Sequence, residues 1–226
     1  MEYGRIRKGK FIVRPNRFIA EVDIGRERAV CHVKNTGRCR ELLVPGYDVI
    51  LCEAENPNRK TKYDLVSVYK GDMLINMDSQ APNKIAAEYL PRLIPNLRSL
   101  KSEVTHEDSR FDFYAETDEE KIFIEVKGVT LEKDGIVLFP DAPTQRGVKH
   151  LNGLARCVKS GYRAIALFVV QMETVKYFTP NVQTHPEFGA ALKKAQADGV
   201  EIYAVRCRVT EKEVSALDLI PVVLES

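Results

Sequence analysis

Short apolar runs separated by turn residues fill the first eighty or so positions. The runs are rich in β-branched and aromatic residues, which favour strands, and the segments between them contain Gly, Pro and Asn. About five such strands predict a small closed or nearly closed barrel, of which the oligonucleotide-binding (OB) barrel is one form. The strand count alone does not separate it from other small barrels. The runs are KFIVRP (10–15), RFIAEVDI (17–24), RAVCHVK (28–34), DVILCEA (48–54) and YDLVSVY (63–69).

From residue 82 onward the pattern changes to a mixture of helical stripes and strands. A continuous apolar run, AIALFVV, is typical of a strand covered on both faces. Asn83 is expected to cap the first helix, and Pro91 to kink or end it. The order of the elements predicts an α/β sandwich with a mixed sheet. The expected helices cover 85–94, 143–160 and 186–198, and the expected strands cover 110–116, 121–131, 164–170 and 201–209.

Two domains are expected from this change, an OB-like barrel over residues 1–81 and an α/β domain over residues 82–226. Hydrophobic residues make up 44% of the 226 residues, which is enough for buried cores. No apolar run of about 18 residues or secretory signal is present, so we expect a cytoplasmic protein without a membrane span. The five cysteines form no CxxC pair, and a Cys31–Cys39 bridge is left open.

Positive charge gathers at the N-terminal end, although the net charge of the chain is only +2. Residues 1–40 hold eleven Lys or Arg against four Asp or Glu, a net charge of +7, and the remainder is net acidic. A basic end of this kind attracts a polyanion such as DNA. A solvated surface of mixed charge explains the composition equally well.

Two neighbouring predicted strands carry acids beside apolar residues. In RFDF, strict alternation directs Phe111 and Phe113 to one face of the strand and Asp112 to the other. In KIFIEVK, Glu125 and Lys127 share one face, opposite the apolar positions between them. Each strand therefore buries one side and presents charged groups on the other.

A hairpin that turns at 118–119 places Asp112 directly opposite Glu125, with Cβ atoms roughly 4.5–5.5 Å apart. Two ionised carboxylates at this spacing repel each other, and a divalent cation such as Mg²⁺ or Mn²⁺ relieves the repulsion because hard cations prefer oxygen ligands. Lys127 adds a positive charge beside a phosphate held there. Asp112, Glu125 and Lys127 are therefore predicted to form a metal-dependent phosphodiesterase site.

Further ligands are expected around this pair. The backbone carbonyl of Val126 is a plausible third metal ligand, and Glu103 is a possible outer one. The alternative reading is a plain exposed hairpin with a salt bridge between Glu125 and Lys127, because a D…ExK pattern also arises by chance.

At this point several motifs resemble one known family, the sugar fermentation stimulation protein A (SfsA) family. They occur in the family's order and extend over essentially the whole chain. Lys34 departs from the pattern, since proline is expected before NTG. The matching segments are NTG (35–37), KSEV (101–104), SRFDF (109–113), EVK (125–127), FPDA (139–142), RG (146–147) and KHL (149–151).

The resemblance implies an N-terminal OB-like barrel and a C-terminal domain of the PD-(D/E)xK nuclease type. It further implies non-specific DNA binding and a role in regulating sugar use. It does not settle catalysis, because a nuclease-type fold can lose its activity.

Several basic residues are predicted to contact DNA. Gly37 is expected to permit a positive φ in a loop at the binding face of the barrel, where Arg38 reaches phosphate. A second group is expected on one exposed face of the helix after FPDA. The predicted DNA contacts are Arg14, Arg17, Arg38, Arg146, Lys149 and His150.

Three functions compete. The first is a metal-dependent nuclease, and the second is a DNA-binding regulator without catalytic activity. The third is an enzyme of sugar metabolism, which the absence of a phosphate-binding glycine loop or dinucleotide fingerprint makes unattractive. The intact set of two acids and a lysine favours the first. Sequence leaves open whether the DNA is single- or double-stranded, and it leaves the oligomeric state open.

Overall fold

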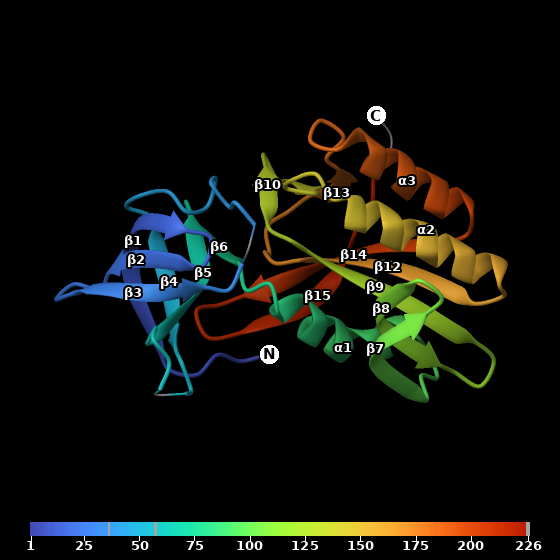
Figure 1. Cartoon of the computed structure of the whole chain (residues 1–226), viewed down its shortest axis with the longest axis horizontal. Helices are drawn as coiled ribbons and strands as arrows, with labels where there is room; N and C mark the ends of the chain where they lie inside the picture. The colour runs from blue at the N-terminus through green and yellow to red at the C-terminus, as the bar shows by residue number, and fades with distance from the viewer. Residues whose placement is uncertain (36, 57, 225–226) are drawn as a thin grey trace.

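Five strands close into a barrel at the N-terminal end of the chain (Figure 1). The structure is a computed structural model that describes residues 1–35, 37–56 and 58–224. The barrel strands follow the order β3-β2-β1-β4-β5, and a parallel pairing of β3 with β5 completes the circle. The closed barrel expected from the sequence is confirmed. Its strands are β1 (Ile6–Asn16), β2 (Ile19–Asp23), β3 (Arg28–Val33), β4 (Asp48–Glu53) and β5 (Tyr63–Lys70), and β6 (Met73–Asn76) extends β5.

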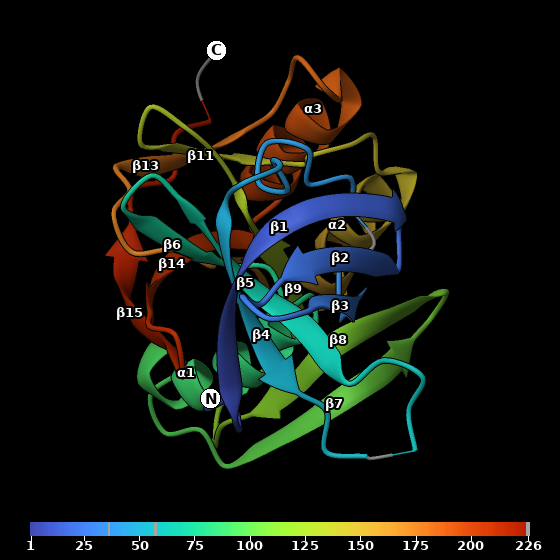
Figure 2. The same cartoon turned by 90° about the vertical axis from the view of Figure 1, so that its left-hand side faces the viewer.

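Alternation explains why these strands form a barrel. Along β3, Ala29, Cys31 and Val33 are buried, while the residues between them face outward. The apolar interior leads directly into the core of the second region, so the two parts share one continuous cluster of buried side chains. Figure 2 looks onto the barrel end of the molecule and shows the remaining elements packed behind it.

A six-stranded mixed sheet forms the second region, with the order β15-β14-β12-β9-β8-β7. One helix covers one face, and two helices cover the other (Figure 1). The predicted α/β class is confirmed. The strands are β7 (Ser99–His106), β8 (Ser109–Glu116), β9 (Lys121–Val129), β12 (Arg163–Val170), β14 (Glu201–Val209) and β15 (Val214–Ile220), and the helices are α1 (Ala81–Leu93), α2 (Gln145–Lys159) and α3 (Pro186–Ala197).

A small three-stranded sheet stands beside the large one. It contains the hairpin of β10 (Leu131–Lys133) and β11 (Ile136–Phe139), and β13 (Tyr177–Pro180) pairs with β11 in parallel. None of these strands exceeds four residues, which is too short for a clear alternation in the sequence.

The start of the first helix differs from the sequence prediction. Gln80, and not Asn83, occupies the N-cap of α1, and its side chain makes no capping hydrogen bond. Asn83 lies in the first turn, where its Nδ2 donates to Asp112 Oδ1 at 2.9 Å. Pro91 does not end the helix, which continues to Leu93.

The cysteines are free thiols, so the Cys31–Cys39 bridge is not formed. Cys31 and Cys39 are both buried, and burial raises the pKa of each thiol to about 12. None of the helices that the structure describes is long and apolar enough to cross a membrane.

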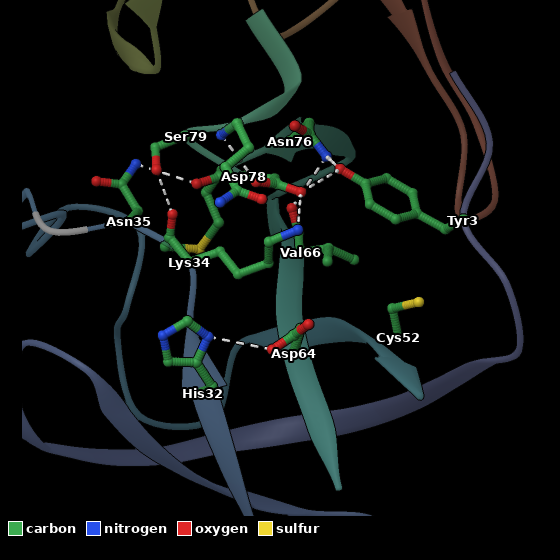
Figure 3. Close-up of polar contacts among 12 residues, drawn as sticks. Tyr3, His32, Lys34, Asn35, Cys52, Asp64, Val66, Asn76, Asp78 and Ser79 are labelled. Carbon is green, nitrogen blue, oxygen red and sulfur yellow. Dashed lines mark hydrogen bonds and ion pairs between the residues drawn. The ribbon is translucent and has the colours of Figure 1, made fainter. Parts of the chain in front are cut away.

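A buried polar network joins the barrel to the large sheet, and Figure 3 shows the part of it around Asp78. Its centre is Asp78, fully buried, whose Oδ2 accepts from Lys34 Nζ at 2.7 Å and from Tyr3 OH at 3.3 Å. Asn76 donates to Tyr3 OH at 2.8 Å, and Gln171 Nε2 donates to Asn76 Oδ1 at 2.8 Å. Lys34, which stands where the resemblance led us to expect proline, therefore supplies the countercharge of a buried carboxylate.

Close packing at Gly128 fixes the start of α1 against the sheet. A Cβ at Gly128 would lie 2.6 Å from Pro82 Cγ and 2.7 Å from Gln171 Oε1. Pro82 belongs to the first turn of α1, and Gln171 follows β12. Only glycine fits without moving one of these neighbours.

We expect Gly128→Ala to lower the free energy of unfolding by about 1–3 kcal/mol, because the added methyl overpacks a tight junction. Urea denaturation followed by circular dichroism measures it. Gly4→Ala is the matched control, since a Cβ at Gly4 meets nothing within 4 Å. Equal stability of the two variants would contradict the close-packing argument.

Candidate functional site

A cavity of about 770 Å³ lies between the barrel and the large sheet. The barrel and the segment after it contribute Asn35, Gly37, Ser79 and Gln80, and the second region contributes the predicted catalytic residues. All three of these, together with Val126, line the cavity: Asp112, Glu125 and Lys127. The structure thus brings the sequence-predicted group together in one concave site.

The hairpin that carries the acids has the predicted register. Phe113 pairs with Ile124 and Tyr114 with Phe123, and Thr117 N donates to Glu120 O at 2.9 Å across the turn. Regular pairing between β8 and β9 runs from Glu116 back to Phe113 and stops there, next to Asp112. There the Asp112 carboxylate accepts the backbone N–H of Val126 at 2.8 Å. A side chain therefore takes the place of a strand carbonyl.

Strict alternation along RFDF is wrong at this point. Phe111 packs on Phe123 with ring centroids 5.2 Å apart, on the face covered by α2. Phe113 belongs to the core on the α1 face. Glu103, across from Asp112 on β7, has a φ of +55°, which marks a local irregularity of the pair. The strand changes face at Asp112.

Glu125 is the most enclosed acid of the site, with 3% of its surface exposed. Its Oε1 is contacted by both Lys127 Nζ and His150 Nδ1. Its Oε2 is buried and has no hydrogen-bond partner among the described residues. An ionised oxygen left in this way is costly unless a further positive group binds it.

The surroundings shift the pKa values of Asp112 and Glu125 in opposite directions. Burial and the neighbouring charge of Glu125 raise the pKa of Asp112, against the opposing hydrogen bonds from Val126 and Asn83. For Glu125, burial alone would raise the pKa, but the hydrogen bond from His150 and the charge of Lys127 outweigh it and lower the pKa. Glu125 is therefore the acid that stays ionised more readily.

His150 has a different place from the one predicted. It is 6% exposed and contacts Glu125, so it belongs to the acid site and not to an exposed DNA-binding face. The side of α2 that carries it is buried because Gly153 lets the helix approach β8, where a Cβ would lie 2.8 Å from Ser109 Oγ. Lys149, one residue away, points elsewhere and donates to the Asp108 carbonyl at 2.8 Å.

The barrel residues predicted to contact DNA differ in their surroundings. Arg14 donates to the carbonyls of Asn35, Gly37, Arg38 and Arg17, so it holds the loop and is not free to bind phosphate. Arg38 is exposed, and so is Arg17, whose guanidinium lies 5.2 Å from the Phe18 ring centroid.

The predicted positive φ of Gly37 depends on the placement of Thr36, so it stays a prediction. Space is tight at Gly37, because a Cβ there would lie 2.8 Å from Asp141 Oδ2 and 2.9 Å from Asn35 Oδ1, so either side chain would have to move. Thr36 of the same motif lies outside the described residues.

Glu103, predicted as a possible outer metal ligand, lies away from the cavity. It is exposed, and its carboxylate forms a salt bridge with Arg110 at 3.7 Å.

The basic residues near the N-terminus are less free than the composition suggests, because several are paired with acids, as in Lys10–Asp48 at 2.7 Å. Of the DNA contacts predicted on the second helix, Arg146 lines the cavity, and its Nε lies 3.4 Å from His150 Nε2.

Sequence reasoning missed several residues that line the site, among them Asn83, Lys84 and Gln171. Asn83 was read as a cap, and Lys84 and Gln171 lie in segments without a motif. Asp141 of the FPDA segment also lines the cavity, and its closeness to the barrel loop depends on the fold, which no local pattern reveals.

Comparison with known proteins identifies relatives along the whole chain. A family model described as the sugar fermentation stimulation protein RE domain matches residues 80–213, and one described as the SfsA N-terminal OB domain matches residues 12–77. The sugar fermentation stimulation protein homolog of Desulfitobacterium hafniense (strain Y51) is 55% identical over 225 residues, 99% of each chain. That of Clostridium beijerinckii is 55% identical over 226 residues, 99% of this chain and 100% of the other.

A solved structure agrees with the architecture. It is titled "The structure of Pyrococcus Furiosus SfsA in complex with Ca2+" and superimposes with a TM-score of 0.87 at 27% identity, covering 99% of this chain and 98% of that chain. The OB assignment of the barrel and the mixed α/β class of the whole are thereby confirmed.

We expect Asp112→Asn to raise the free energy of unfolding of the metal-free protein by about 0.5–2 kcal/mol at pH 7, as is common when a functional residue is replaced. The folded-state pKa of Asp112 is raised, so its ionised form opposes folding at neutral pH. Below the ordinary carboxyl pKa of about 3.9 both states are protonated and the gain should vanish. Urea titrations at pH 7 and at about pH 3 measure it. A gain that persists unchanged in acid would exclude this electrostatic origin.

Proposed function

This chain belongs to the sugar fermentation stimulation protein family, and we propose that it is a DNA-binding protein with a metal-dependent phosphodiesterase site. The observation that carries the proposal is the unpartnered Glu125 Oε2, buried in the same cavity as Asp112 and Lys127. A cytoplasmic location is part of the proposal.

The donor set fits a hard divalent cation. Asp112 and Glu125 offer carboxylate oxygens, which Mg²⁺ and Mn²⁺ prefer, and Val126, which also lines the cavity, would offer its backbone carbonyl. The Pyrococcus furiosus relative is described as a complex with Ca²⁺, a cation with the same preference for oxygen. When bound, such an ion supplies a Lewis acid that polarises a phosphoryl oxygen and lowers the pKa of water.

The chain's own groups have separate tasks at this site. Asn83 and the Val126 N–H fix the two oxygens of Asp112 at 2.9 and 2.8 Å. His150 holds Glu125 from the α2 side, so the carboxylate keeps one orientation. Lys127 places a positive charge where negative charge develops on a phosphate during hydrolysis.

DNA binding is proposed to rest on phosphate contacts, without strong sequence preference. Lys84 and Arg146 line the cavity, and Arg17 and Arg38 are exposed on the barrel. Such contacts position a backbone without reading bases, and the affinity they give falls as salt rises. A regulator of sugar metabolism that binds DNA without cleaving it is the alternative, and the complete acid–acid–lysine set favours hydrolysis over it.

Metal binding should depend on Glu125. We expect Mg²⁺ or Mn²⁺ to raise the melting temperature of the parent, since a ligand at 100 times its Kd stabilises the folded state by about 2.7 kcal/mol. Glu125→Gln should lose this shift, and Glu103→Gln should keep it because Glu103 lies outside the cavity. Differential scanning calorimetry with and without metal decides. A parent without any metal-dependent shift would argue against the metal site.

Lys127 separates an enzyme from a binder. We expect Lys127→Ala to lower the metal-dependent cleavage rate by about 10²–10³, because it removes a charge from the transition state. DNA affinity at fixed salt should stay within a few-fold, since one phosphate contact among many is worth little. Lys149→Ala is the control, an exposed lysine of α2 engaged by Asp108.

Cleavage rates and binding curves come from the same preparations, on single-stranded, duplex and branched DNA. Equal rates for Lys127→Ala and the parent would remove Lys127 from the mechanism. A parent that binds DNA but cleaves no substrate with either metal would establish the binding-only alternative.

A further inference from the structure

An apolar wall lines the cavity that holds the acids. Leu131 and Leu138 face each other as a cross-strand pair of the β10–β11 hairpin, and Phe139 follows directly. All three are only half-buried, although they are large and apolar. Phe139 is held edge-on by Phe168 and Phe188, with ring centroids 5.6 and 5.1 Å away. Phosphate chemistry requires charged and polar groups, so it does not by itself explain an apolar wall in the site.

Amide groups line another side of the same cavity. They come from the barrel loop, the start of α1 and the end of β12: Asn35, Gln80, Asn83 and Gln171. Figure 1 shows the small sheet, at β10 and β13, on one side of the large sheet's middle strands and α1 on the other. The cavity therefore combines apolar residues of the β10–β11 hairpin with amide groups from other elements.

Two of these amides are fixed before any ligand arrives. Gln171 Nε2 donates to Asn76 Oδ1 at 2.8 Å and to the Asp78 carbonyl at 3.0 Å, which leaves its Oε1 as the acceptor. Asn35 Nδ2 donates to the Met77 carbonyl at 3.1 Å. Such groups together can hold a nucleobase. The preordered amides bind its polar edge by hydrogen bonds, and the apolar surface packs against its face.

We propose that the site takes an unpaired nucleotide, whose base lies against the Leu131–Leu138–Phe139 wall while its phosphate reaches Lys127 and Arg146. The inference rests on the proposed function and names its substrate class. The volume of about 770 Å³ falls within the range of about 300–1,000 Å³ of small-ligand pockets, a size suited to single nucleotides. A base stacked and paired within a duplex has no free face to offer such a wall.

Substrate preference follows from this arrangement. Single-stranded DNA, or a strand with an unpaired segment, binds without the cost of opening a helix, whereas intact duplex must be unstacked first. The protein therefore selects DNA by the absence of pairing and not by base sequence, since every base has a face for stacking.

The test uses the full-length protein with Ca²⁺ in place of Mg²⁺ or Mn²⁺, and gels confirm that the DNA stays intact. Fluorescence anisotropy gives the affinity for a labelled single strand and for the blunt duplex of the same sequence. A 2-aminopurine in the strand reports whether a base becomes buried. We expect the single strand to bind at least about 10-fold more tightly, with a change in 2-aminopurine emission.

Leu138→Ala should weaken single-strand binding by about 5- to 20-fold and leave duplex binding unchanged, because truncation removes part of a stacking surface. Ile136→Ala is the matched control, a half-buried aliphatic two residues earlier on β11 that does not line the cavity. Circular dichroism of both variants verifies folding.

Equal affinity for single strand and duplex would overturn the nucleotide pocket and leave the proposed function standing. So would equal losses in the two variants. A parent that binds neither form of DNA, and cleaves neither, would overturn the proposed function and the pocket with it.

Discussion

One hydrogen bond determines the shape of the site: the Asp112 carboxylate accepts the N–H of Val126. In an ordinary hairpin a backbone carbonyl of β8 would fill this position, and the two strands would continue side by side. Here a side chain substitutes for the carbonyl, so β8 turns its residues to a new face and Phe111 joins the α2 side of the core. The acid that interrupts the pairing also lines the cavity that the interruption leaves.

The same bond links folding to electrostatics. Asp112 is held in place by donors on both oxygens, yet its burial beside Glu125 makes its charge unfavourable. Glu125 is compensated on one oxygen only, by Lys127 and His150. The fold therefore tolerates excess negative charge at one point, which is how strained groups commonly mark a site of function.

Sequence patterns predicted what depends on neighbours along the chain. The polar segment between two apolar strands was enough to give the hairpin register, and alternation was enough to give the barrel. Contacts between distant segments were beyond reach. His150 contacts Glu125 only because Gly153 lets α2 approach β8. The Arg14 guanidinium donates to carbonyls of a loop more than twenty residues away along the chain. The sequence pattern did not predict the change of face at Asp112, because alternation of side chains assumes an uninterrupted strand.

The polar network around Asp78 has a consequence for how the barrel is held. Tyr3 lies before the first barrel strand and Asp78 follows the last, yet Tyr3 OH lies 3.3 Å from Asp78 Oδ2. The two ends of the barrel therefore lie side by side, and one buried carboxylate ties them together. Because the barrel also shares a continuous apolar core with the second region, it is part of one body and not a unit that could be exchanged alone.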